Sequence, residues 1–201
     1  AVIVNGWDIK DPSLLTYIWA GGSTTGTAAS GTTVRTDWSN PLNWNLKIVP
    51  ENHCTVIIPD GLTDYPAVPS KNGIVTEWRA GNLTLGSGAG TAKITLNDAD
   101  LVLSGMAGNV TAPAAVTNKG TIVYTNAGRI TNGTAAVNDV TQGTVEYAAG
   151  STAYSGVISE TGAEDYFNLK ISGNTWEFPE NIKVKDILTV SGGTFKGIPE
   201  A

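Results

Sequence analysis

The sequence predicts an all-β fold, and three observations support this prediction. Short runs of alternating apolar and polar residues recur between Asn82 and Phe195, and each run is closed by Gly, Asn or Ser. No long stretch with helical periodicity separates these runs. The polar share of the chain consists largely of Thr, Asn and Ser beside 24 Gly, residues that suit strands and tight turns and are poor helix formers.

The recurring runs have the length of single strands and return at quasi-regular intervals. They are Asn82–Leu85, Lys93–Leu96, Leu101–Leu103, Thr121–Tyr124, Thr144–Tyr147, Asn168–Ile171 and Ile187–Val190. Such units are typical of stacked β architectures, because one unit buries its apolar face only against its neighbours. We therefore expect a right-handed parallel β-helix with roughly 20–25 residues per coil.

In such a coil the side chains at alternate positions point inward and form apolar columns along the stack. The predicted inward residues are Leu83, Leu85, Ile94, Leu96, Leu101 and Leu103, whereas Thr84, Thr95 and Val102 are expected to face outward or toward a flank. Gly-Ser-Gly-Ala-Gly at 86–90 is expected to form a corner with positive φ angles. Alternation alone does not separate parallel from antiparallel pairing, so a β-sandwich with a hairpin at Asn132-Gly133 is the alternative.

The first third of the chain has a different composition from the repeats. Residues 1–70 are predicted to form an entry segment and a Trp/Pro-rich cap, followed by β-helix repeats over 71–201 in one continuous structural domain. The Gly/Ser/Thr/Ala-rich segment 21–33 predicts a flexible loop. Trp38 and Trp44 flank an Asn-Pro turn and are expected to cover one end of the core. No equivalent cover follows the last repeat, so we expect the chain to be a fragment of a longer protein.

Two groups of motifs support a resemblance to a known family. The first is Trp-x-Gly at 19–21, Asp-Trp-Ser-Asn-Pro-x-Asn-Trp at 37–44, Val-Ile-Ile-Pro at 56–59 and Tyr-Pro at 65–66. The second comprises the phrases at 143–147, 166–173 and 181–195, which include Asn-Leu-Lys-Ile and Leu-Thr-Val-Ser-Gly-Gly. Together they resemble the large repetitive surface proteins of Bacteroidetes, in which a Trp-rich module precedes parallel β-helix repeats. The resemblance implies a noncatalytic, adhesin-like protein on the bacterial surface.

Composition excludes several classes of partner. The formal net charge is −6 and no run of basic residues occurs, so we exclude nucleic acid, whose binding depends on Lys and Arg at phosphates. No apolar stretch reaches membrane-spanning length. The single cysteine, Cys54, is predicted to be a buried core residue, and the single histidine, His53, excludes a multi-histidine zinc site. We expect an extracellular or cell-surface location, a glycan or host polymer as partner, and no cofactor.

The chemistry-bearing residues predict no catalytic or metal site. Trp78, Trp176 and Tyr154 are candidate sugar-stacking aromatics, provided that their rings are exposed. Asp98 and Asp100 are spaced to share one strand face, as calcium or acid–base chemistry would need, but their segment is predicted to be a turn. The favoured function is therefore a noncatalytic module that presents a rigid β-solenoid surface. The alternatives are a carbohydrate-binding module and a polysaccharide-active β-helix enzyme.

Overall fold

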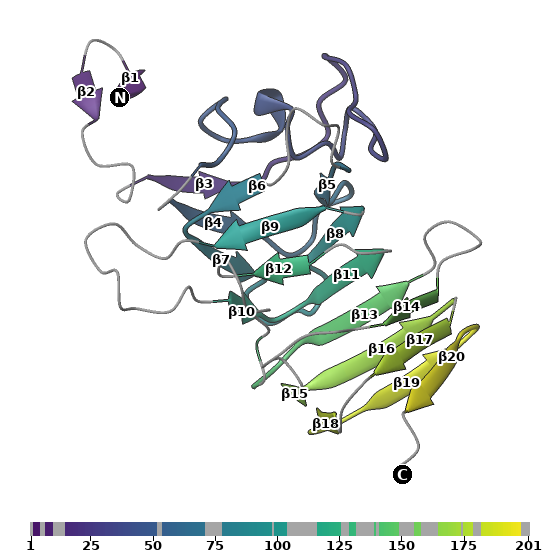
Figure 1. The fold of residues 1–201 in the computed structure, drawn as a ribbon. Coiled ribbons are helices and arrows are strands. Elements are labelled where there is room, and N and C mark those ends of the chain that lie inside the picture. The colour runs from purple at the N-terminus through teal and green to yellow at the C-terminus, as the bar shows by residue number, and fades with distance from the viewer. Residues whose placement is uncertain are drawn as a thin grey trace.

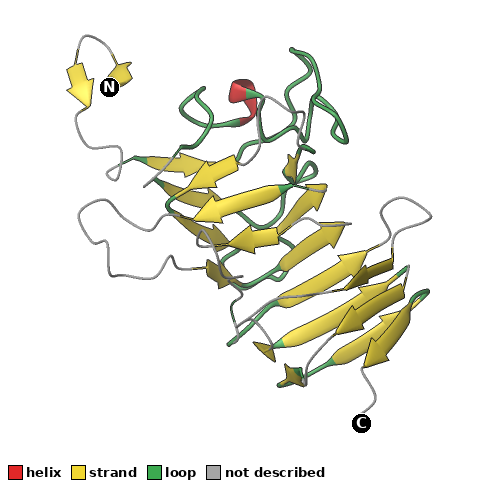
Figure 2. Ribbon diagram, in the orientation of Figure 1, coloured by secondary structure: helices red, strands yellow, loops and turns green. Residues whose placement is uncertain are grey.

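The computed structural model is all-β with parallel sheets (Figures 1 and 2). It describes residues 2–4, 7–9, 15–51, 54–70, 78–97, 99–103, 116–125, 129–131, 139, 141–148, 155–157, 165–173, 175–178 and 182–197. Within these residues the helical content is one short 3-10 turn, η2 (Pro41–Asn43).

Two parallel sheets contain half of the named strands. The larger has the order β19-β16-β13-β11-β8-β5 and the smaller the order β10-β7-β4-β3. The six-stranded sheet comprises β5 (Ala67–Val68), β8 (Lys93–Asn97), β11 (Thr121–Thr125), β13 (Thr144–Ala148), β16 (Asn168–Ser172) and β19 (Leu188–Ser191). The four-stranded sheet comprises β3 (Thr16–Ile18), β4 (Thr55–Ile58), β7 (Asn82–Leu85) and β10 (Val116–Asn118).

The remaining strands form smaller sheets. One short parallel sheet contains β6 (Trp78–Ala80), β9 (Asp100–Leu103) and β12 (Arg129–Thr131). A second contains β14 (Ser155–Val157), β17 (Thr175–Phe178) and β20 (Thr194–Gly197). A third pairs β15 (Asp165–Tyr166) with β18 (Lys183–Val184). At the N-terminus β1 (Val2–Val4) and β2 (Trp7–Ile9) pair antiparallel with each other.

From β4 onward, consecutive named strands belong to different sheets, and from β4 to β12 the order in which they visit the sheets repeats. β7, β8 and β9 lie in the four-, six- and three-stranded sheets, and β10, β11 and β12 then pair with them in the same sequence. Every pairing between named strands from β3 to β20 in the described residues is parallel. This pairing does not match the antiparallel hairpins of the β-sandwich alternative, whose proposed turn at Asn132-Gly133 lies outside the described residues.

The strand register aligns apolar residues into columns, as the alternation predicts. In the six-stranded sheet one column pairs Ile94, Ile122, Val145, Leu169 and Leu188, and the next pairs Leu96, Tyr124, Tyr147, Ile171 and Val190. All six residues predicted to point inward are fully or almost fully buried. Thr84 and Thr95 are half-buried, whereas Val102 is buried. The seven runs predicted from sequence are all strands, so the period of two located them correctly.

Aromatic rings fill the core at two levels. Toward the C-terminal strands Tyr147 lies 5.5 Å from Tyr124, 6.2 Å from Tyr166 and 5.1 Å from Trp176, measured between ring centroids. The hydroxyl groups of Tyr147 and Tyr166 are 2.9 Å apart and hydrogen-bonded. Each of these buried hydroxyl groups therefore has a hydrogen-bond partner inside the core, as is usual for a buried tyrosine.

The Trp-rich segment covers the N-terminal end of the core. Trp44 makes edge-to-face contacts with Tyr17, Trp19 and Trp38, at centroid distances of 6.3, 5.0 and 4.7 Å. Its Nε1 donates a hydrogen bond to the Trp38 carbonyl at 2.8 Å. All four rings are buried, which confirms the predicted burial of Trp38 and Trp44.

Loop residues close the outer edges of the first strands. Asn45 donates its backbone N–H to the Ile18 carbonyl, and its Oδ1 accepts from the Ile18 N–H at 2.8 Å, along the outer edge of β3. Along β5 the Ala67 N–H donates to the Thr36 carbonyl, and the Ala67 carbonyl accepts from the Trp38 N–H. This capping satisfies backbone groups that an open sheet edge would expose.

Candidate functional site

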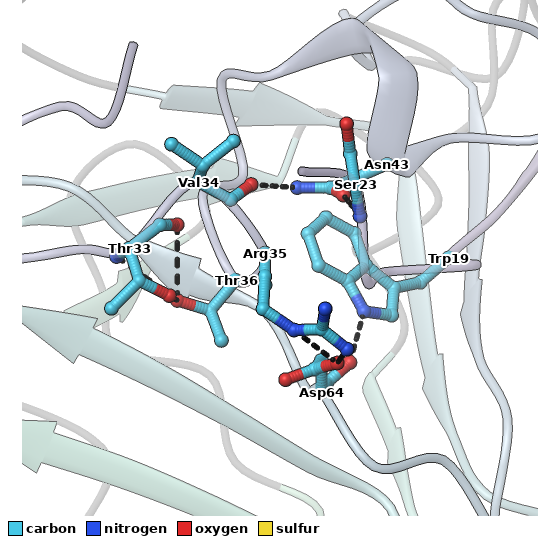
Figure 3. A network of polar contacts seen from close by, with 8 residues as sticks. All are labelled: Trp19, Ser23, Thr33, Val34, Arg35, Thr36, Asn43 and Asp64. Carbon is cyan, nitrogen blue, oxygen red and sulfur yellow. Dashed lines mark hydrogen bonds and ion pairs between the residues drawn. The ribbon is translucent and has the colours of Figure 1, made fainter. Parts of the chain in front are cut away.

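The polar contacts of the cap centre on Asp64 and Asn43 (Figure 3). Arg35 donates from Nε and Nη2 to Oδ2 of Asp64 at 3.0 and 2.7 Å, and Trp19 Nε1 donates to the Asp64 carbonyl at 2.8 Å. Asn43 Nδ2 donates to the Val34 carbonyl at 2.9 Å. An indole that is buried in the core is thereby connected to an ion pair at the surface.

Three polar side chains hold the segment that the sequence predicts to be a flexible loop. Buried Asp37 accepts from the N–H of Ala29 at 2.6 Å, Asn40 Nδ2 donates to the carbonyl of Thr25 at 3.0 Å, and Asn43 Oδ1 accepts from the N–H of Ser23 at 2.9 Å. The segment is a loop, as predicted, and these three side chains bond its backbone. They belong to the 37–44 motif, of which the sequence analysis interpreted only the Asn-Pro pair, as a turn.

The Asp60 carboxylate accepts hydrogen bonds from the backbone of the corner at 86–90 and of the two residues that follow it. Backbone N–H groups of Ser87 and Ala92 donate to the Asp60 carboxylate at 2.6 and 2.9 Å, and the Ala89 and Thr91 N–H groups add bonds at 3.3 and 3.0 Å. These bonds hold the pKa of Asp60 well below its usual range, because they favour its charged form. Gly86, Gly88 and Gly90 have positive φ angles, as predicted for this corner. Its N–H groups therefore bind a carboxylate of the same chain.

The outer face of the six-stranded sheet presents polar side chains that lie side by side on neighbouring strands. Strands β13 and β16 alternate half-buried and buried residues, so the residues between the core positions face outward. We call this surface the polar ladder, and define it by Lys93, Thr95, Thr121, Thr125, Thr144, Glu146, Asn168, Lys170, Ser172, Thr189 and Ser191. Successive rungs of such a sheet lie about 4.8 Å apart, so chemically similar groups recur at a regular spacing.

Contacts between neighbouring strands order the polar ladder. Lys170 Nζ lies 3.1 Å from Glu146 Oε1 on the adjacent strand, and the Ser172 hydroxyl donates to the same carboxylate oxygen. Thr125 Oγ1 donates to the Leu96 carbonyl at 3.0 Å, and Asn168 Oδ1 accepts from the Ile187 N–H at 3.0 Å. The exposed ion pair contributes little to stability, roughly 0–1 kcal/mol, but it fixes two long side chains. Buried Val123 is an apolar exception within this face.

Of the three predicted sugar-stacking residues the structure describes two, Trp78 and Trp176. Trp176 is fully buried, packs on Tyr147 and donates from Nε1 to the Gly173 carbonyl at 3.1 Å, so neither face of its indole is open to a sugar. This corrects its assignment, because its position at an inward register makes it part of the core. Trp78 is half-buried, packs against the core and donates to the Pro69 carbonyl at 3.1 Å. Tyr154 lies outside the described residues.

The titratable candidates that the structure describes give no cluster. Cys54 is buried and its thiol donates to the Glu51 carbonyl, and burial raises the pKa of the thiol, so it has the character of the predicted core residue. His53, Asp98 and the acidic stretch at 159–165, except its last residue, lie outside the described residues, as does the side chain of Asp100. Among the described residues no three His, Cys, Asp or Glu side chains gather where they would hold a metal ion.

Comparison with known proteins gives no relative: no family model, no curated protein and no solved structure matches the chain. Across the part of the chain that the structure describes, no helix is long and apolar enough to span a membrane.

Proposed function

We propose that the chain winds as a right-handed parallel β-helix closed at its front by the Trp-rich cap. Three features support this architecture: the repeating order in which strands visit the sheets, the parallel pairing, and the in-register apolar columns from β8 to β19. In a solenoid of this kind each coil contacts only its neighbours, so the molecule is stiff along its axis. Its outer faces then display side chains at a fixed spacing.

We further propose that the protein is a noncatalytic, secreted or cell-surface module of the adhesin-like type that its sequence resembles. The observation that carries this proposal is the polar ladder, where hydroxyl, amide and paired charged groups recur over five parallel strands. A periodic array of hydrogen-bonding groups matches a partner that repeats in one dimension, such as an extended polymer. Each contact would be weak, and a polymer that bridges several rungs would gain affinity from their combination.

The experiment is a binding assay of the 201-residue chain against immobilised neutral and acidic polysaccharides and extracellular-matrix polymers. Thr121→Arg places a bulky cation within the polar ladder, and the matched control Thr84→Arg makes the same change on the outer face of the four-stranded sheet. We expect Thr121→Arg to weaken polymer binding by about tenfold or more, equivalent to about 1.4 kcal/mol. Thr84→Arg should bind as the unaltered chain does.

Three outcomes would overturn the proposal. The first is the absence of binding to any polymer, and the second is an equal loss in both Arg variants. The third is release of new reducing ends from a polysaccharide, which would indicate the enzyme alternative. If Trp78→Ala removes binding that Thr121→Arg leaves intact, the carbohydrate-binding alternative based on aromatic stacking is the better description.

A further inference from the structure

The polar ladder contains one row of side chains whose hydrogen-bonding groups are unused. Thr121, Thr144 and Asn168 lie side by side in register on β11, β13 and β16, and all three are half-buried. Asn168 Oδ1 accepts from the Ile187 N–H, but its Nδ2 and the two threonine hydroxyl groups make no hydrogen bond to the described part of the chain. We call these three residues the uncharged row.

The other rows of the same face are interrupted or already hydrogen-bonded. Two residues further along the strands, Glu146 is paired with Lys170 and Val123 is apolar. Four residues further along, the hydroxyl groups of Thr125 and Ser172 donate to a backbone carbonyl and to Glu146. The uncharged row is therefore the part of this face that offers unused donors and acceptors on three successive strands, about 4.8 Å apart.

The charges of the polar ladder limit the class of polymer that fits it. Its charged residues are Lys93, Glu146 and Lys170, and the last two form an ion pair at 3.1 Å. Lys93, which pairs in register with Thr121, is then the one uncompensated charge of the ladder over its five strands. A polyanion with a charge on every repeat needs more cations than this. An uncharged polysaccharide presents hydroxyl groups, which donate and accept as the threonine hydroxyl groups do.

The same face does not suit a protein partner. Protein interfaces have a core of apolar and aromatic side chains, but every exposed large apolar side chain of the described residues lies outside the polar ladder. The strands β11, β13 and β16 each pair with a neighbouring strand on both sides, so no strand of a partner can be added to them. Hydroxyl and amide groups on a face without apolar anchors favour a hydroxylated partner.

We infer that the uncharged row is the contact site for an uncharged polysaccharide, which lies across the strands and hydrogen-bonds to Thr121, Thr144 and Asn168 in turn. The inference rests on the proposed function, and it adds the class of polymer and the residues that contact it. The row spans two strand intervals, about 10 Å. Each contact is weak, so affinity depends on several contacts being made at once.

The first test compares polymers of different charge. The 201-residue chain is titrated with neutral polysaccharides (dextran, a soluble mixed-linkage β-glucan and galactomannan), with acidic ones (polygalacturonate and heparin) and with matrix proteins. We expect binding to at least one neutral polysaccharide. Its dissociation constant should change by less than about twofold between roughly 0.05 and 0.5 M NaCl, because the contact contains no charge pair for salt to screen.

The second test removes single hydroxyl groups. Thr121→Val and Thr144→Val keep the shape of the side chain and its preference for a strand, and each should weaken binding to the neutral polysaccharide by about three- to tenfold. The matched control Thr84→Val makes the same change at a half-buried threonine of the four-stranded sheet and should bind as the unaltered chain does. Urea denaturation of the three variants verifies that each is folded.

The possible failures separate this inference from the proposed function. Binding to acidic polysaccharides alone, with an affinity that falls as salt rises, overturns the inference and leaves polymer binding in place, as does binding to matrix proteins alone. Unchanged affinity in Thr121→Val or in Thr144→Val, or an equal loss in Thr84→Val, also overturns it. Absence of binding to every polymer overturns the proposed function and this inference with it.

Discussion

The cap offers a comparison of two buried indoles that differ in one hydrogen bond. Trp38 and Trp44 are both fully buried and lie in edge-to-face contact at 4.7 Å. Trp44 Nε1 donates to the Trp38 carbonyl at 2.8 Å, whereas Trp38 Nε1 has no hydrogen-bond partner among the described residues. Replacing each by Phe removes an indole N–H from the same layer, but only Trp44→Phe loses a hydrogen bond with it.

The magnitude follows from what each substitution leaves behind. Trp44→Phe removes the donor and leaves the buried Trp38 carbonyl without that bond, a loss of about 1–3 kcal/mol beyond the change in packing. Trp38→Phe removes an unpaired buried donor, so no bond is lost and a desolvation cost disappears. We expect the free energy of unfolding of Trp44→Phe to be lower than that of Trp38→Phe by about 1–3 kcal/mol. For a chain of this size each kcal/mol corresponds to about 2–4 °C in Tm.

The assay is urea denaturation followed by far-ultraviolet circular dichroism, since tryptophan fluorescence itself changes in both variants. Leu46→Ala, a change at an exposed cap residue, serves as the control and should alter stability by less than about 0.5 kcal/mol. Equal destabilisation by the two Phe variants would refute the reasoning, as would a larger loss in Trp38→Phe. Either result would mean that the hydrogen bond to the Trp38 carbonyl does not stabilise the cap.

Two further predictions concern turns between strands. Asp60→Asn should lower the urea midpoint of unfolding at pH 7. Because the pKa of Asp60 is depressed in the folded state, the difference in midpoint between the unaltered chain and this variant should shrink as pH falls below about 4. A difference at pH 3 that equals the one at pH 7 would contradict this. Gly143→Ala and Gly61→Ala impose similar strain, at φ values of 76° and 78°, but only the Cβ at Gly143 would meet another atom, the Asn118 carbonyl oxygen at 2.1 Å. Gly143→Ala should therefore cost about 1–3 kcal/mol more than Gly61→Ala in urea denaturation, and equal costs would contradict the contact.

The strands and their inward faces could be predicted because they depend on local pattern. The runs at Asn82, Lys93 and Thr121 begin strands where the alternation places them, and the inward leucines and isoleucines are buried. Trp176 shows where this reasoning was incomplete. It lies at an inward position of β17 opposite Phe195, but local alternation does not indicate which aromatic residues are buried in the core.

The site depended on contacts between residues that are distant in sequence. Asp60 meets the 86–92 corner, and Glu146 meets Lys170, only because parallel strands stack in one particular register. The roles of Asp37, Asn40 and Asn43 were likewise missed, because the Asn-Pro pair at 40–41 signals a turn whether or not the Asx side chains around it also bond a distant loop.

The sequence by itself determined that the chain forms short strands, which side of each strand is apolar, and which glycines turn the corners. The period of two and the φ preference of glycine are properties of neighbouring residues, so they can be read without partners. Only the tertiary structure decided that the strands pair in parallel and that the indoles pack edge to face over one end of the core. Those outcomes depend on which distant segments share hydrogen bonds, and alternation is the same for either direction of pairing.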